Sequence, residues 1–344
     1  MRLEKTLISE SMSKINDAVK VLEARQTAND NLDELIEFEK WDSAYSMASK
    51  GLTEMPWLVD GLFPKTGLAV VYGSADTGKS TLLRQLCLCV VAGIHWVGYK
   101  TKPEHKRTAY ISTEDDIDSL SVILPKQIKE MEYDKAHCKN IYFLFQAGDV
   151  HAELKALLEK GHKFDLVVID CWSDIYNFNN SQANQVRVFL SNFNDLARIH
   201  KVLIIFNHHS KKEIEHKKPH KSNVSGVGLV SKSRLAIEFR NDPLDKELRH
   251  LCIVKGNYIQ DDLKMDSVCL NFSSGFHFKP EANGNKPFEI LAVSSEEKAQ
   301  ADENIYEYAQ NNSQVETAEH FGVAQSSVSR AIKRHEQRKL YNKE

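Results

Sequence analysis

Residues 67–91 read GLAVVYGSADTGKSTLLRQLCLCVV, and this stretch decides the fold. It contains the signature G-x-x-x-x-G-K-S, which runs from Gly73 to Ser80. Residues 68–72 are a short apolar run typical of a buried strand. Residues 80–92 form a longer, Leu-rich run without Pro or Gly, which predicts a helix. In a strand, glycine loop and helix of this order, backbone N–H groups and a helix N-terminus face phosphate oxygens.

The residue types in this loop fit nucleotide binding. Gly73 and Gly78 allow backbone angles that a side chain would block. We expect Lys79 to place its charge on the β- and γ-phosphates of ATP, and the Ser80 hydroxyl to bind Mg²⁺. The structural alternative is a glycine-rich turn with an exposed Lys. The nucleotide-binding set predicted from the loop is Gly73, Ser74, Ala75, Asp76, Thr77, Gly78, Lys79, Ser80 and Thr81.

The composition predicts a globular protein of one large domain with additions, or of two domains. The chain has 344 residues, of which 42% are hydrophobic and 27% charged, and its net charge is −3. Such a charge does not favour nucleic acid globally, so a nucleic-acid site would have to be a local patch. None of the six Cys forms a C-x-x-C pair, which indicates buried, reduced thiols. We find no secretory or membrane-spanning apolar stretch and expect a cytoplasmic protein without a membrane partner.

Apolar strands alternate with helices along the middle of the chain. Strands are predicted at 108–112, 141–145, 166–170 and 202–206, and helices at 119–131, 151–162 and 184–200. Strands that are apolar on both faces and separated by helices indicate an α/β protein with a mostly parallel, fully covered sheet. Later strands are predicted at 234–239, 251–255 and 267–271, where the pattern favours antiparallel hairpins.

The predicted domains are an N-terminal helical arm (1–50), an ATPase core (51–280), a linker (281–300) and a small all-α module (301–344). In the arm, apolar residues recur at steps of three and four, which predicts one helix face; they are Ile8, Met12, Ile15, Val19 and Leu22. Such a face can pack on the main domain or on a neighbouring subunit, and the sequence does not choose between them.

Acidic residues follow two predicted strands at the edge where parallel sheets bind ligands. Asp170 ends the strand LVVID, which is the Walker B pattern, and we expect it to hold Mg²⁺ together with Ser80. Glu114 follows the strand 108–112 and could orient the attacking water. Asp115 and Asp116 come next, and one of these three carboxylates could instead cap the following helix.

Histidines follow the strand 202–206, in the stretch NHHSKK (207–212). A histidine there could report the γ-phosphate state by hydrogen bonding, and the alternatives are a helix cap or a metal site. A zinc site could be drawn from the histidines of this region, but the stretch offers no Cys partner and is rich in Lys. These histidines are His208, His209, His216 and His220.

Two segments are candidates for DNA binding. Residues 211–221 hold five Lys and two Glu, and they precede 222–228, which we interpret as flexible. The charge suits a single-stranded backbone, and the alternative is a solvated surface loop. The candidate contacts are Lys211, Lys212, Lys217 and Lys218.

The C-terminal residues 315–333 resemble a helix-turn-helix, with Gly322 in the turn. Its small core would contain Ala318, Val323, Val328 and Ile332. Residues 325–344 contain six Lys or Arg and two Glu, a local charge of +4 that suits duplex DNA. A helical protein-binding module is the alternative. The side chains expected to project toward a major groove are Gln325, Ser326, Ser327, Ser329, Arg330 and Lys333.

Seven segments together carry a family resemblance. In order they are PWLVDGLFP, GSADTGKS, STEDD, LVVIDCWSD, FNHHSKK, SKSRLAIEF and VKGNY. Over about residues 55–275 the chain resembles RecA-like ATPases, and within them the RepA-type hexameric replicative helicases of plasmids. The resemblance implies that Glu114 is the catalytic carboxylate, His208 the γ-phosphate sensor and Arg234 an arginine finger reaching a neighbouring subunit. Lys255 and Asn257 would lie near the same shared nucleotide site.

The leading hypothesis is therefore an Mg²⁺-dependent ATPase that moves on DNA. It would act as a homo-oligomer such as a hexamer, with single-stranded DNA in its pore and duplex DNA on its C-terminal module. The alternative hypotheses are a DNA-binding regulator switched by ATP, and a helicase loader without unwinding activity.

Overall fold

The computed structural model describes residues 16–25, 41–145, 148–176, 182–211, 214, 216–293, 295–323 and 325–341. The chain divides into two compact units, Met1–Met55 and Pro56–Glu344. In the first unit, residues 16–25 are helical and α2 spans Ala44–Ala48. Val19 and Leu22 are exposed in that helix. The rest of the predicted apolar face, Ile8, Met12 and Ile15, lies outside the described residues.

The second unit is built on one large sheet. Among the described residues, nine strands follow the order β11-β10-β9-β8-β3-β7-β6-β4-β5. From that first edge to the last, they are β11 (Lys279–Pro280), β10 (Val268–Asn271), β9 (Leu248–Gly256), β8 (Leu235–Asn241), β3 (Gly67–Gly73), β7 (Leu203–His209), β6 (Leu166–Asp170), β4 (Thr108–Ser112) and β5 (Ile141–Phe145). The strands from β8 to β5 are parallel, and β9, β10 and β11 are antiparallel to their neighbours. The predicted α/β architecture is confirmed, except that β8 belongs to the parallel part.

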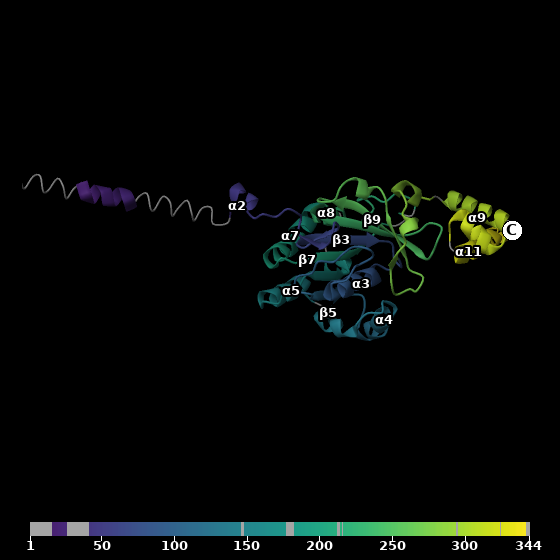
Figure 1. The fold of residues 1–344 in the computed structure, drawn as a ribbon, viewed down its shortest axis with the longest axis horizontal. Helices are drawn as coiled ribbons and strands as arrows, with labels where there is room; N and C mark the ends of the chain where they lie inside the picture. The colour runs from purple at the N-terminus through teal and green to yellow at the C-terminus, as the bar shows by residue number, and fades with distance from the viewer. Residues whose placement is uncertain are drawn as a thin grey trace, which may run out of the picture. The chain divides into compact units, whose positions relative to one another are not determined.

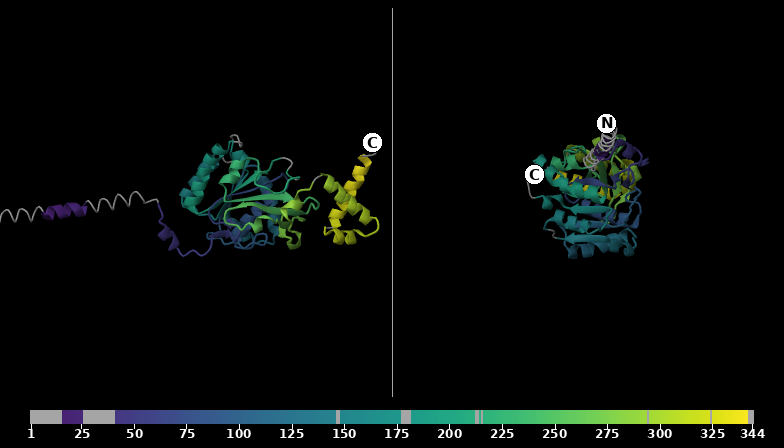
Figure 2. Two further views of the ribbon diagram at one scale, coloured as in Figure 1. Left: turned by 90° about the horizontal axis from the view of Figure 1, so that it is seen from above. Right: turned by 90° about the vertical axis from the view of Figure 1, so that its left-hand side faces the viewer.

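Helices cover this sheet on both faces (Figures 1 and 2). Successive residues of a strand point to opposite faces. Ala69 and Val71 of β3 therefore join a core with α3 (Lys79–Ala92), whereas Leu68 and Val70 join a core with α5 (Val150–Glu159) and α7 (Ala183–His200). The helix α4 (Ile117–Glu130) packs beside α3.

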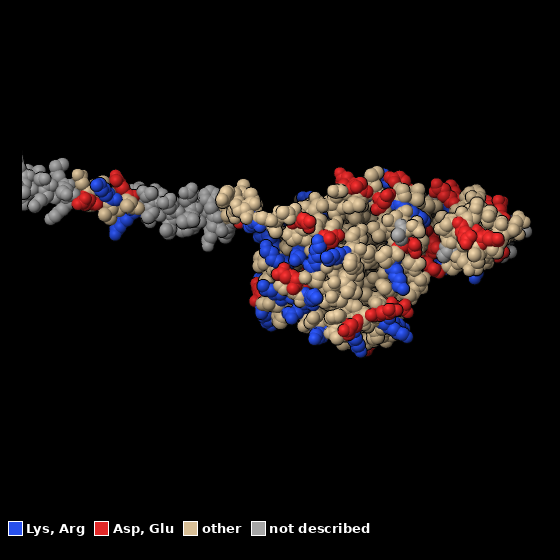
Figure 3. All heavy atoms as spheres, viewed as in Figure 1, with Lys and Arg blue, Asp and Glu red and all other residues tan. Residues whose placement is uncertain are grey.

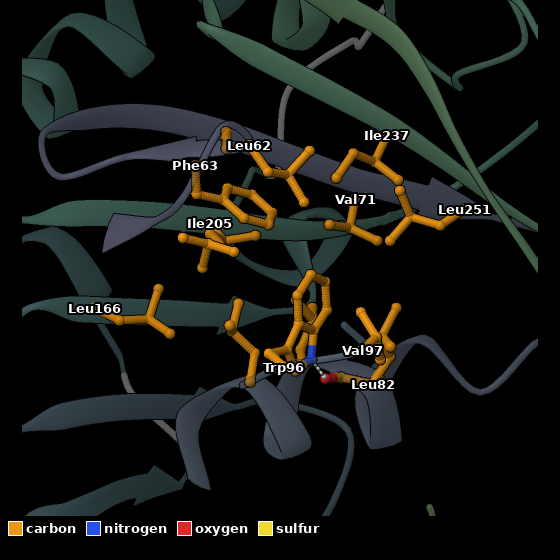
Figure 4. Close-up of a cluster of buried hydrophobic side chains, with 14 of the residues drawn as sticks. Leu62, Phe63, Val71, Leu82, Trp96, Val97, Leu166, Ile205, Ile237 and Leu251 are labelled. Atoms are coloured by element: carbon orange, nitrogen blue, oxygen red, sulfur yellow. Dashed lines mark hydrogen bonds between the residues drawn. The ribbon is translucent and has the colours of Figure 1, made fainter. Parts of the chain in front are cut away.

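The core on the α3 face is closed by the segment before β3. There β1 (Trp57–Val59) pairs with β2 (Phe63–Pro64). Figure 4 shows Phe63 and Trp96 in this core, with their ring centroids 6.0 Å apart. The indole N–H of Trp96 donates to the carbonyl of Leu82 at 3.4 Å, so this buried polar group is satisfied.

Short elements fill the connections. They are α6 (Trp172–Ile175), α8 (Val227–Lys232) and the 3₁₀ helices η1 (Lys135–Asn140), η2 (Asp262–Lys264), η3 (Ala282–Gly284) and η4 (Phe288–Leu291). The expectation of a flexible stretch at 222–228 is wrong for its last residues, where α8 begins. Gly228 permits this packing, because a Cβ at that position would lie 2.7 Å from Val186 of α7.

Three helices end the second unit: α9 (Ser295–Ala309), α10 (Gln314–Phe321) and α11 (Gln325–Tyr341). Ser313 and Glu316 form a capping box at the start of α10, and Gly322 ends it with φ 63°. The buried core of the three helices consists of Ile305, Ala318, Val328 and Ala331, with Val323 and Ile332 packed against it. No helix among the described residues has the length and apolar character needed to span a bilayer.

Candidate nucleotide site

The loop between β3 and α3 has the shape that its glycines predict. A Cβ on Gly73 would lie 1.9 Å from the backbone oxygen of Phe239, so no side chain fits there. Gly78 is the N-cap of α3, has φ 88°, and lies against the ring of Phe278. Asp76 is exposed and has φ 59°. These features leave a cradle of backbone N–H groups at the N-terminus of a 14-residue helix.

Lys79 is buried inside this loop. Its Nζ donates to the backbone oxygen of Ser74 at 2.7 Å. Burial lowers the pKa of the amine, while the carboxylates of Asp170 and Glu114 act in the opposite direction. A cation held by the loop's own carbonyl and facing two carboxylates is placed to bind phosphate oxygens.

The end of β6 supplies the predicted metal ligand. Asp170 is buried, and its carboxylate accepts hydrogen bonds from Tyr110 and from the amide of Asn207. The same Asn207 amide also lies 3.4 Å from the Ser80 hydroxyl. Asn207 therefore joins the two groups predicted to hold Mg²⁺, and a hydroxyl and a carboxylate at one point fit the oxygen ligands of that ion. The sequence analysis assigned no role to Asn207 or Tyr110, although Asn207 follows an apolar strand as Asp170 does.

The three consecutive carboxylates after β4 have different partners. Asp116 caps α4, since it accepts from the backbone N–H of Ser119 at 2.7 Å, and these bonds lower its pKa. Asp115 pairs with the buried Arg84 at 3.3 Å. Glu114 lies 3.5 Å from Nε2 of His209 and remains half exposed toward the loop. The expected helix cap is thus Asp116, and Glu114 is the carboxylate that faces the site.

The two histidines at the end of β7 also differ. His208 is buried, and its Nε2 donates to the backbone oxygen of Ser225. Burial lowers the pKa of His208 to about 4, so its ring is neutral near pH 7. His209 is partly exposed and contacts Glu114. The prediction that His208 contacts the γ-phosphate is not tested, but the geometry brings His209 closer to the catalytic candidate.

Arg234, Lys255 and Asn257 gather at the opposite edge of the sheet. Arg234 precedes β8 and lies beside Gly67 at the start of β3, whereas the phosphate loop follows the end of β3. The N–H of Asn257 donates to the carbonyl of Arg234 at 3.0 Å. Lys255 donates to the carbonyls of residues 230, 231 and 233 at the end of α8. None of these three residues can therefore serve the nucleotide site of its own chain.

A hairpin contact to the phosphate loop could not be predicted. Nε of Arg249, on β9, donates to the backbone oxygen of Thr77 at 3.2 Å. This guanidinium also lies over the ring of Phe272, which stacks on Phe278 at 4.0 Å. The antiparallel end of the sheet thus supports the loop, and no motif in the sequence signals that pairing.

The predicted basic loop is anchored by uncharged contacts. Lys211 donates to the backbone oxygen of Ser222, and Lys218 forms an exposed ion pair with Glu289 at 3.7 Å. The side chain of Glu238, buried in β8, accepts from the backbone N–H of His220. Lys217 is exposed, and Lys212 lies outside the described residues. The anchor lies at the end of β8, one strand from the phosphate loop.

In the C-terminal helices one expectation is wrong: Ser327 is buried and accepts a hydrogen bond from Arg330, so it does not project from α11. Gln325, Ser329 and Lys333 are exposed. Ser326 donates to Glu247 at 2.8 Å, and Arg330 lies 3.6 Å from Asp245 and 3.8 Å from Glu247. Figure 3 shows prominent acidic side chains on the visible face of these helices.

The fold and the site define a RecA-like P-loop ATPase. The AAA domain family matches residues 33–215, more than half of the 344 residues, and the chain belongs to this family. The solved ATPase domain of a helicase has a similar structure, with a TM-score of 0.52 and 13% identity; the match covers 72% of this chain and 98% of that one. A RadB recombinase matches with a TM-score of 0.45 and 16% identity, over 62% of this chain and 90% of that one. None of the curated protein sequences matches.

Proposed function

We propose that this chain is an ATP-hydrolysing motor on DNA that works as a RepA-like replicative helicase of a plasmid or other mobile element. The observation that carries the proposal is the separation of two sets of residues. Lys79, Ser80, Asp170 and Glu114 meet at the carboxyl edge of the sheet, and Arg234 lies at the other edge. Such an arrangement needs a second subunit to bring an arginine to the phosphates, as a ring would.

In this proposal each residue has a defined task. Lys79 and the loop N–H groups bind the phosphates, and Ser80 and Asp170 hold Mg²⁺, which supplies charge neutralisation between the β- and γ-phosphates. Glu114 orients the attacking water. His209, 3.5 Å from Glu114, is better placed than the buried His208 to sense the γ-phosphate. The basic loop after β7 would face single-stranded DNA.

The test is ATP turnover with and without single-stranded DNA, run beside a strand-displacement assay. We expect single-stranded DNA to stimulate turnover, and displacement to require hydrolysis. Turnover that ignores single-stranded DNA, together with no displacement, would contradict the helicase proposal while leaving the ATPase intact.

A DNA-binding regulator switched by ATP, or a helicase loader, is the second candidate. We propose that α10 and α11 form a helix-turn-helix, and the contacts of Ser326 and Arg330 with Glu247 and Asp245 favour this candidate. These contacts occupy groups that a duplex would need. Duplex binding by the full chain should then change with ATP, and Lys333→Ala should weaken binding to all sequences alike. Binding that is sequence-specific, ATP-dependent and unaccompanied by unwinding would favour the regulator.

A further inference from the structure

A carboxylate, a thiol and an imidazole converge beside the nucleotide site. Glu114 follows β4, Cys171 follows β6 and His209 ends β7, and these three strands are neighbours in the sheet. One ligand atom from each lies within 4.8 Å of the other two. Glu114 Oε1 and His209 Nε2 are 3.5 Å apart. The histidine stretch lacks a Cys in sequence, and the parallel sheet supplies one from another strand.

This donor set suits a borderline-soft cation. Zn²⁺ binds thiolate, imidazole and carboxylate, with bond lengths of about 2.0–2.3 Å in tetrahedral geometry, so its ligand atoms stand about 3.5 Å apart. Three protein ligands leave a fourth position open, as in zinc sites that keep a water. A thiolate is a poor ligand for Mg²⁺, which prefers oxygen. The cluster is therefore distinct in chemistry from the pair Ser80 and Asp170.

The surroundings hold the three groups in place and give an ion access. The backbone N–H of Cys171 donates to Thr113 Oγ1 at 2.9 Å, and the N–H of Thr113 donates to the backbone oxygen of Asp170 at 2.7 Å. These bonds tie the end of β4 to the end of β6. The thiol is buried, whereas the side chains of Glu114 and His209 are 50% and 43% exposed. An ion can reach the cluster from that exposed side.

We propose that Glu114, Cys171 and His209 form a zinc-binding site that withdraws Glu114 from catalysis and so inhibits ATP hydrolysis reversibly. The inhibitory part rests on the proposed function, because it assumes that Glu114 orients the attacking water. A carboxylate bound to Zn²⁺ no longer has a free oxygen pair aimed at that water. The metal-binding part rests on the cluster alone.

Metal binding is tested first, without ATP, by titrating the full chain with Co²⁺ as a spectroscopic probe. We expect a thiolate-to-cobalt charge-transfer band, tetrahedral d–d bands and displacement of cobalt by Zn²⁺. Cys171→Ser and His209→Asn should each lower the affinity at least about tenfold, since even outer-shell changes cost that much. Cys138→Ser is the matched control, because Cys138 lies before β5 and outside the cluster. A cobalt spectrum that is absent, or that survives Cys171→Ser, overturns the site.

Inhibition is tested second, as the ratio of ATP turnover without Zn²⁺ to turnover with Zn²⁺ at excess Mg²⁺. We expect a high ratio for the wild type and for Cys138→Ser, reversal by a chelator, and a ratio near one for Cys171→Ser. Cobalt binding without any ATP turnover would remove the proposed function and leave the metal site. ATP turnover that zinc at saturating occupancy leaves unchanged would overturn the inhibitory role.

Discussion

At the scale of single residues, three adjacent carboxylates with the same charge are separated by their surroundings. Asp116 is used by the helix α4, Asp115 by Arg84, and Glu114 by neither. The sequence shows only Glu-Asp-Asp after a strand, and hydrogen bonding distributes the roles. His208 and His209 show the same effect, because the alternation along β7 buries one ring and leaves its neighbour at the site.

Substitutions in this group separate binding from turnover. Glu114→Gln keeps the shape but removes the charge, so we expect near-normal Mg-ATP affinity and a kcat lower by about 10²–10⁴-fold. Lys79→Ala removes the buried cation, and we expect tight Mg-ATP binding to be lost. Asp116→Asn is the control, since Asn caps helices as well as Asp does. Nucleotide titration and steady-state turnover measure both quantities. Normal turnover by Glu114→Gln would move the role to Asp115.

At the scale of elements, the three C-terminal helices depend on one buried carboxylate. Asp302 of α9 is fully buried and binds Arg334 at 2.6 Å and Arg338, both on α11. Arg334 is therefore committed to the fold and is not available beside Arg330 and Lys333 for DNA. The positive charge predicted for this segment is partly neutralised inside it.

Replacing Asp302 should loosen these helices selectively. Asp302→Ala leaves two arginines without their shared partner, and we expect a loss of about 3 kcal/mol in the stability of α9–α11. Hydrogen exchange should show faster opening of amides in α9 and α11, with the strands β3 and β6 protected as before. Glu303→Ala, one residue along the same helix and outside this ion pair, is the control. Equal exchange in the two variants would contradict the structural role of Asp302.

The sequence predicted elements better than it predicted their contacts. The bounds 108–112, 141–145 and 166–170 agree with β4, β5 and β6, because apolar residues in these runs are framed by polar ones. The phosphate loop, Asp170 and Glu114 could be placed because all follow strands of one parallel sheet. Arg249 beside Thr77 and Cys171 beside His209 depend on long-range pairing, which leaves no local pattern. Ser327 was misplaced because a small polar residue does not reveal which helix face is buried.

At the scale of the whole molecule, the opposite-edge position of Arg234 predicts shared nucleotide sites. Lys79→Ala and Arg234→Ala should each be inactive alone, and mixing them should restore part of the turnover. An intact Lys79 and an intact Arg234 can then meet at one interface, where an arginine finger contributes about 10³-fold or more in rate. ATP turnover of the mixture at constant total protein measures the rescue.

The control for this experiment is Arg198→Ala, because Arg198 is an exposed arginine on α7. It should be active alone and give no gain on mixing with the wild type. If mixed oligomers are confirmed by their masses and no turnover returns, Arg234 does not act between subunits.

The hairpin of β8 and β9 has contacts in two directions at once. Its Arg249 holds the carbonyl of Thr77, and its Glu247 holds Ser326 of α11. A duplex read by α11 must compete with Glu247, and a nucleotide that shifts Thr77 must act on the same hairpin. Linkage requires the coupling to be mutual: the factor by which ATP changes the dissociation constant for duplex equals the factor by which duplex changes that for ATP. Two binding titrations, each repeated with the other ligand saturating, therefore report a single coupling free energy between the two ends of this hairpin.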